Sequence, residues 1–183
     1  MVASIDSRTI CTIYVILGLV TAITLAIVTP PMQNPDEMAH FSRADQISRG
    51  RIVGQRYDVR VVGGEIAVGI GAVNSAMGDI PMHPSVKVTR KKIREANTAL
   101  WTDGTTRAGF ANTVVYPPIF YLPSAVGIKI GEALNLRVVQ TLCVSRILSA
   151  VASVSIGALA ILVAGTAAPW IFAVVTLPTR FFT

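Results

Sequence analysis

The sequence predicts an all-α transmembrane protein with about three spanning helices, a partial fourth, and a large mixed extracytoplasmic loop carrying juxtamembrane helices. Hydrophobic residues make up 52% of the chain and charged residues only 14%, which departs from the balance of soluble proteins. Residues 10–28 form an uncharged run long enough to cross a hydrocarbon core of about 30 Å. Residues 147–179 form a second uncharged run.

The first apolar run, residues 10–28, predicts transmembrane helix 1 after a cytoplasmic N-terminus at residues 1–9. The alternative is a secretory signal peptide, because Arg8 precedes the run. A cleavage site would need small residues where the chain has Thr29-Pro30-Pro31, so an uncleaved anchor is favoured.

Two further spans are predicted, at residues 117–136 and 147–166, joined by a cytoplasmic turn at 137–146. In the second span, Lys129 and Glu132 lie one helical turn apart and can form an ion pair. An external turn and a truncated fourth helix follow at 167–183. The ending predicts that the chain is the N-terminal part of a longer protein.

Basic residues in the short segments predict the orientation, because positive charge favours the cytoplasmic side. Arg8, Arg137 and Arg146 are therefore expected in the cytoplasm, and residues 29–116 form an extracytoplasmic loop. About half of the net charge of +6 lies in this loop, where the basic residues are dispersed among acids, so nucleic acid is not an expected partner. Cys11 and Cys143 predict neither a disulfide framework nor a metal motif.

The extracytoplasmic loop is expected to contain a helix at about 35–49, a Gly-rich irregular or β-like stretch at about 58–80 and a basic helix at about 85–100. In the first helix, Asn34 suits the N-cap, Pro35 the first helical position and Glu37 a capping box. Gly50 is expected to end it.

Three titratable residues of this helix have none of these structural roles. Asp36, His40 and Arg43 share one helical face, with Glu37 one turn before His40. Such a group can act as a general base or hold a divalent cation, although the same row is common on solvated helices. Its position just beyond the first span favours a role on a substrate at the membrane surface.

A family resemblance rests on four stretches: "PPMQNPDEMAHFSRADQISRG", "GDIPMHPSVKV", "NTVVYPPIFYLPSAVGIKIGEAL" and "SRILSAVASVSIGAL". Together they resemble the domain-of-unknown-function 2142 family of bacterial polytopic membrane proteins. That family in turn is similar to class C (GT-C) glycosyltransferases, which use polyprenyl-phosphate sugars. The resemblance implies a multi-pass protein of the bacterial cytoplasmic (inner) membrane.

The resemblance implies a hexosyltransferase-like activity on a polyprenyl-phosphate donor, for which this piece alone is expected to be inactive. Asp36 would be the catalytic base, assisted by Glu37. The leaving lipid phosphate needs positive charge, which Arg43 or the cluster Arg90, Lys91 and Arg94 could supply. A divalent metal ion is one alternative cofactor, with Asp36, Glu37 and His40 as its ligands. The partners are then the bilayer and the lipid-linked sugar.

Two other functions remain open from the sequence. The chain could be a non-catalytic membrane protein whose loop binds a partner or a polysaccharide. It could also belong to a transporter or channel, which Lys129 and Glu132 suggest. The sugar, the acceptor and the oligomeric state are not specified by any motif.

Overall fold

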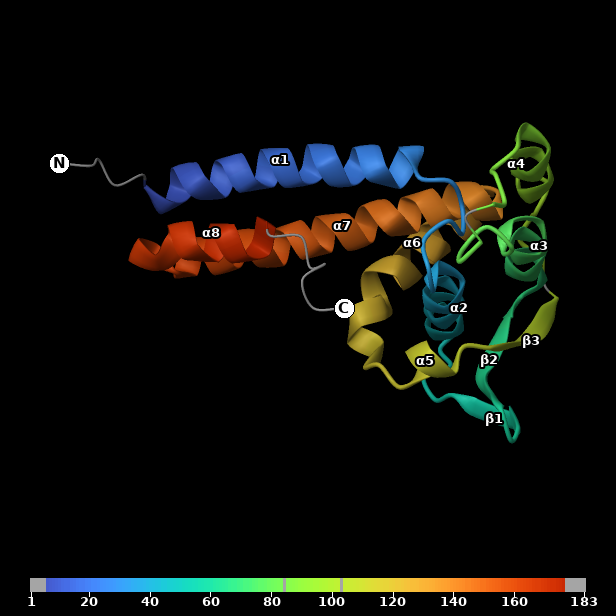
Figure 1. Cartoon of the computed structure of the whole chain (residues 1–183). Coiled ribbons are helices and arrows are strands. Elements are labelled where there is room, and N and C mark those ends of the chain that lie inside the picture. The colour runs from blue at the N-terminus through green and yellow to red at the C-terminus, as the bar shows by residue number, and fades with distance from the viewer. Residues whose placement is uncertain (1–5, 84, 103, 177–183) are drawn as a thin grey trace. The chain divides into compact units, whose positions relative to one another are not determined.

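The computed structural model describes residues 6–83, 85–102 and 104–176. The chain forms two compact units, one of residues 1–25 and 150–183 and the other of residues 26–149 (Figure 1). Two long helices, α1 (Ser7–Val28) and α7 (Val138–Val163), contribute residues to both units.

The first unit consists of apolar helices that pack side by side. It contains most of α1, the second half of α7, the short 3-10 helix η2 (Gly165–Ala167) and α8 (Ala168–Thr176). Tyr14 of α1 packs on Gly157 of α7, where a Cβ atom would lie only 2.2 Å from the tyrosine oxygen. The same tyrosine meets Phe172 of α8 edge-to-face, with 6.3 Å between ring centroids. Close contact between these helices therefore depends on a residue without a side chain.

Two helices, α1 and α7, are long and apolar enough to cross a membrane among the residues described. Only 17% of the most apolar window of each is buried within the protein, so both expose apolar side chains as lipid-facing helices do. The first predicted span is confirmed as a helix, and three or more spans are not. Of the predicted truncated fourth helix, residues 168–176 are helical as α8, and residues 177–183 lie outside the described part.

The predicted second span, residues 117–136, forms the 3-10 helix η1 (Pro118–Tyr121) and α6 (Leu122–Ala133). The 12 residues of α6 extend about 18 Å, less than a hydrocarbon core of about 30 Å. Asn135, with φ of 53°, then reverses the chain. The following helix begins at Val138, within the expected turn at 137–146, because its first turns pack into the core.

The second unit contains a three-stranded antiparallel sheet in the order β1-β2-β3 (Figure 1). Its strands are β1 (Gln55–Asp58), β2 (Val61–Ala67) and β3 (Thr105–Gly109). Gly63 pairs with Gly109, and a Cβ on Gly63 would lie 1.9 Å from the Ala108 carbonyl oxygen. The glycine-rich stretch thus allows the closest approach of β2 and β3, and it continues into a helix rather than remaining β-like to residue 80.

Helices surround this sheet and bury a common core. They are α2 (Glu37–Ser48), α3 (Val68–Met77), α4 (Arg90–Ala96) and α5 (Ala111–Val114). The core includes fully buried apolar side chains from α2, β2, α3, α6 and α7, namely Phe41, Ala44, Ile66, Ile70, Val73, Met77, Ile128 and Val138. Helix α2 therefore lies between the sheet and the helices that lead into α7.

The start of α2 differs from the expected capping box. The residue before the helix is Asp36, in the left-handed conformation with φ of 63° and ψ of 0°, and its side chain makes no cap hydrogen bond. Glu37 is the first helical residue, and its carboxylate turns to other partners, described below. The end of the helix agrees with the prediction, because Gly50 follows with φ of 76°.

Asp45 is fully buried in α2 and predicts how stability depends on pH. Its carboxylate accepts hydrogen bonds from the Ala67 N–H (2.8 Å) and from Arg49 Nε (3.0 Å), but burial still raises its pKa. The folded chain then holds a proton more tightly than the unfolded chain, whose Asp pKa is about 3.9. Stability should therefore increase as the pH falls through the raised pKa toward about 3.9.

Thermal unfolding in detergent across this pH range measures the effect, and Asp45→Asn should remove it. Asp79 is a matched control of opposite sign, because Lys92 lowers the pKa of its exposed carboxylate. The wild-type chain should lose stability through this carboxylate as the pH falls, and Asp79→Asn should remove that loss. Identical pH profiles for wild type and Asp45→Asn would contradict the prediction.

Candidate functional site

Arg146 forms a clamp within the second unit. Its Nε and Nη2 each donate to one carboxylate oxygen of Glu37 at 2.7 Å. The remaining N–H groups donate to three backbone carbonyls around the end of α1, those of Ala26 (3.1 Å), Thr29 (2.7 Å) and Pro30 (3.1 Å). Every donor of the guanidinium is thus used, and α7 is tied to both α1 and α2.

Glu37 is equally committed to this clamp. Besides the bidentate pair with Arg146, its Oε2 accepts the Met32 N–H at 2.7 Å. Both side chains are mostly buried, with exposed fractions of 14% for Arg146 and 11% for Glu37. Glu37 therefore holds the segment between α1 and α2, and both of its carboxylate oxygens accept hydrogen bonds within the clamp.

The position of Arg146 also differs from the expected topology. We expected Arg146 on the cytoplasmic side, opposite the loop that follows α1. In the structure it contacts Thr29 and Pro30, the first residues of that loop. The physical reason is that α6 is too short to carry the chain across a membrane between the loop and α7.

Asp36 is the acidic residue of this region that the clamp leaves out. It is exposed, and it precedes Glu37 in a left-handed backbone conformation that costs energy for residues other than glycine. Asp and Asn tolerate this conformation best. The chain thus holds an exposed carboxylate in a strained backbone next to a rigid ion pair, close to the end of α1.

A pocket of about 230 Å³ opens beside the clamp. His40 contributes an exposed ring whose Nδ1 lies 3.1 Å from the buried hydroxyl of Tyr121. The imidazole stacks between Tyr121 and Tyr116, with centroid distances of 5.9 and 6.4 Å. The lining comprises acidic, basic, hydroxyl and aromatic side chains: Glu37, His40, Phe41, Phe120, Tyr121, Ser124, Leu142, Ser145, Arg146 and Ser149.

The expected metal ligands do not assemble. Across residues 6–83, 85–102 and 104–176, no group of three or more His, Cys, Asp or Glu side chains is placed to hold a metal ion. Glu37 is occupied by Arg146, and His40 Nδ1 by Tyr121. Asp36, Glu37 and His40 therefore do not fit a divalent metal site, and no step is assigned to one.

The predicted phosphate-binding residues fall into two groups. Arg43 is 2% exposed, and its guanidinium donates a hydrogen bond to Gln46, while its Nε has no partner. Burial lowers the pKa of Arg43. It faces the core of the unit rather than an incoming phosphate. Arg90, Lys91 and Arg94 are exposed on α4, which Thr89 caps by accepting from the Lys92 N–H.

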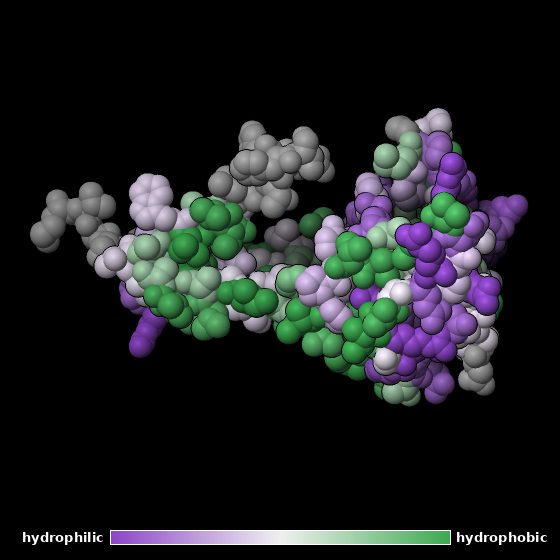
Figure 2. Space-filling model, turned by 90° about the horizontal axis from the view of Figure 1, so that it is seen from below, coloured by the Kyte–Doolittle hydropathy of each residue, from purple (hydrophilic) through white to green (hydrophobic). Residues whose placement is uncertain are grey.

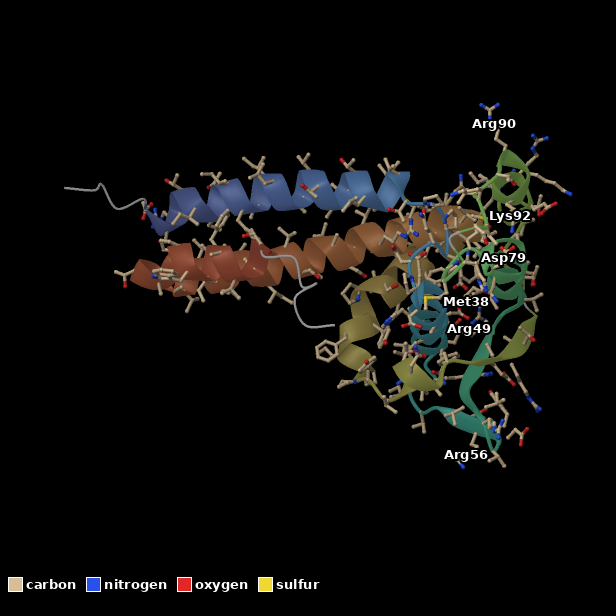
Figure 3. The ribbon with its side chains drawn as sticks, viewed as in Figure 1. Met38, Arg49, Arg56, Asp79, Arg90 and Lys92 are labelled. Atoms are coloured by element: carbon tan, nitrogen blue, oxygen red, sulfur yellow. The ribbon has the colours of Figure 1, made fainter. Side chains whose placement is uncertain are left out.

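Two cations of α4 have carboxylate partners. Lys91 pairs with Glu95 at 3.8 Å and Lys92 with Asp79 at 2.5 Å. Figure 3 shows Arg90 pointing away from the rest of the protein, at the outer end of α4. None of the ion pairs formed among the described residues involves Arg90 or Arg94, so these two are the cluster members open to an anion.

The clamp residue Arg146 was missed by sequence reasoning, which treated it as a flank of a cytoplasmic turn. The available signal was its place in an otherwise uncharged helical segment, because a charge there requires a partner. Tyr121, which contacts His40, was also not among the predicted site residues. Its hydrogen bond to His40 could not be read from residues that lie 81 positions apart.

Comparison with known proteins agrees with the membrane character of α1 and α7. No curated protein and no solved structure matches the chain. Residues 19–183 match one family model, described as a predicted membrane protein (DUF2142). The match covers most of the sequence, including α2, the pocket and α7, and the chain belongs to this DUF2142 family of membrane proteins.

Proposed function

We propose that this protein is part of a glycosyltransferase that moves a sugar from a polyprenyl-phosphate carrier to an extracytoplasmic acceptor. The observation that carries the proposal is the exposed carboxylate of Asp36, held in a strained backbone beside the Glu37–Arg146 clamp. Strain of this kind persists where surrounding structure enforces it, and it concentrates at functional sites. The location next to a spanning helix suits a substrate with a lipid carrier.

Asp36 acts as the general base in this proposal. Its carboxylate takes the proton of an acceptor hydroxyl, whose oxygen bonds to the anomeric carbon of the sugar. The bond from that carbon to the phosphate oxygen breaks, and polyprenyl phosphate leaves with the electron pair. Arg90 and Arg94 are the exposed cations that could stabilise the leaving phosphate, whereas Glu37 and Arg146 hold Asp36 in position.

The proposal places the protein in the bacterial cytoplasmic membrane with its N-terminus in the cytoplasm. Arg8, next to the start of α1, supports this orientation through the preference of positive charge for the cytoplasmic side. Asp36 then lies on the extracytoplasmic side.

The test uses an intact protein of this family that carries these residues, in proteoliposomes with radiolabelled polyprenyl-phosphate hexoses and soluble oligosaccharide acceptors. The release of polyprenyl phosphate is measured, because it reports reaction with any acceptor, including water. Asp36→Asn should lower the rate by about 10²- to 10⁴-fold, as expected for loss of a general base. Asp58→Asn, at an exposed acid of β1, is the matched control and should retain the rate.

A second variant separates catalysis from stability. Asp36→Gly relieves the left-handed strain, so thermal stability should be unchanged or higher while the reaction is lost. Wild-type release by Asp36→Asn would remove Asp36 from the mechanism. An intact wild-type protein that releases no polyprenyl phosphate from any donor would contradict the transferase proposal.

The aromatic wall of the pocket favours a second candidate, a non-catalytic loop that binds a polysaccharide. His40, Tyr116 and Tyr121 stack there, and Phe120 is 73% exposed at the rim, which offers flat surfaces to sugar rings. This function predicts that Phe120→Ala weakens retention of the protein on an immobilised envelope polysaccharide while Asp36→Asn does not. The transferase proposal predicts instead that Asp36→Asn lowers the release of polyprenyl phosphate more than Phe120→Ala does.

A further inference from the structure

Helix α6 and the preceding η1 expose a continuous apolar face. Ile119, Leu122, Val126 and Ile130 follow one another at spacings that share one side of a helix, with exposed fractions of 66%, 48%, 53% and 38%. In Figure 2, apolar side chains gather in the portion that carries α6, whereas hydrophilic ones cover the portion that carries the sheet. A surface of this kind on one helix indicates a partner.

The opposite face of α6 is already used for packing within the unit. Ile128 is fully buried, and Gly127 and Gly131 bring α6 against Ser145 and Thr141 of α7. The exposed apolar residues are therefore not the face by which α6 packs on α7. They point away from the contacts that fix α6 beside the first half of α7.

The position along α7 gives the depth of this face. Arg146 contacts the carbonyls at the end of α1, so it marks the level at which that spanning helix ends. Ser149 lies three residues, or about 4.5 Å, further along α7 than Arg146. It lines the same pocket as Phe120 and Ser124. The N-terminal end of α6 thus packs beyond Arg146 along α7, toward the uncharged half of that helix, and this is the deeper end of the face.

Polar and aromatic residues frame the apolar face as they do at a bilayer surface. Lys129 is half exposed and pairs with Glu132 at 2.7 Å, toward the end of α6 that is further from Phe120. Tyr116 and Phe120 lie at the other end, with exposed fractions of 49% and 73%. Aromatic rings and long cationic side chains are typical of the membrane interface.

We propose that η1 and α6 form an interfacial helix that inserts its exposed face into the bilayer, in the leaflet at the C-terminal end of α1. Ile119, Leu122 and Val126 contact acyl chains, and Lys129 reaches the phosphate headgroups. The helix is too short to cross, and its deeper end lies beside a spanning helix, so lipid is the occupant that the geometry favours. This inference goes beyond the proposed function and does not depend on it.

The test places a nitroxide label on the face in a Cys11→Ser and Cys143→Ser background, reconstituted in phosphatidylcholine vesicles. A label at Val126→Cys should be relaxed strongly by oxygen, which concentrates in lipid, and weakly by a water-soluble nickel chelate. Val59→Cys, 81% exposed in the β1–β2 turn, is the matched control and should show the opposite ratio. Equal ratios at the two sites would overturn the proposal, as would shielding of Val126→Cys from both reagents, which indicates covering by protein.

A second measurement keeps both native cysteines. Phe120→Trp adds a tryptophan at the deeper end of the face, and vesicles with brominated acyl chains should quench the added fluorescence severalfold more than vesicles without bromine. Val59→Trp should add fluorescence that brominated lipid does not quench. Absence of lipid quenching at Phe120→Trp would also reject insertion.

Discussion

Replacing Arg146 with methionine is expected to lower the free energy of unfolding by about 3–5 kcal/mol, the range for removing one partner of a buried ion pair. The substitution keeps much of the side-chain volume but leaves the Glu37 carboxylate without its cation, at an exposed fraction of 11%. It also removes the Arg146 donor from the carbonyls of Thr29 and Pro30, and the Pro30 carbonyl keeps only the Gln33 N–H at 3.4 Å. Chemical unfolding in detergent, followed by helical circular dichroism, measures the loss.

The control for this prediction is Arg137→Met. Arg137 is exposed near the start of α7 and donates only to the Asn97 carbonyl, at 3.0 Å, and to no carboxylate. Its replacement should change the free energy of unfolding by about 0.5 kcal/mol or less, as for most surface positions. An equally small effect of Arg146→Met would show that the clamp does not hold the unit together.

A double-mutant cycle separates the ion pair from the backbone contacts of Arg146. Glu37→Gln alone leaves the guanidinium buried without a carboxylate, while Glu37→Gln with Arg146→Met leaves neither charge. The double variant should therefore be less destabilised than the sum of the two single variants. Simple additivity would mean that the two side chains act independently despite their 2.7 Å contacts.

The elements that were predicted well from the sequence have local signals. The uncharged run at residues 10–28 is long enough to determine α1 by itself. The helix ending before Gly50 follows from the left-handed residue that terminates it. The basic helix at Arg90–Ala96 begins at the Thr89 cap, although it is shorter than the predicted 85–100.

The features that were missed depend on distant contacts. Glu37 and Arg146 lie 109 positions apart, so a capping box was the only partner that sequence could offer Glu37. In the same way, the apolar composition of residues 117–136 resembles a span, but α6 uses one side for packing on α7 and ends at Ala133, before the chain reverses at Asn135. The left-handed conformation of Asp36, next to this long-range ion pair, was not predicted from the surrounding residues.

Gly127→Ala is expected to lower the free energy of unfolding by about 1–3 kcal/mol, the cost of overpacking a tight contact. A Cβ atom at this position would lie 2.7 Å from the Ser145 Cα and 3.0 Å from its nitrogen. These are backbone atoms of α7, which a change of side-chain rotamer cannot move. The substitution therefore has to separate α6 from α7 by shifting a helix.

Gly71→Ala provides the same chemical change with the opposite expected sign. Gly71 is also inside a helix, α3, but the nearest heavy atom to its added Cβ is Thr106 Cγ2 at 3.8 Å, an ordinary contact. The alanine should raise the free energy of unfolding by about 0.5–1 kcal/mol, because it restricts the unfolded chain more than glycine does. Parallel unfolding of both variants in detergent measures the difference. Equal effects would show that helix propensity alone governs Gly127, and that α6 does not depend on close contact with α7.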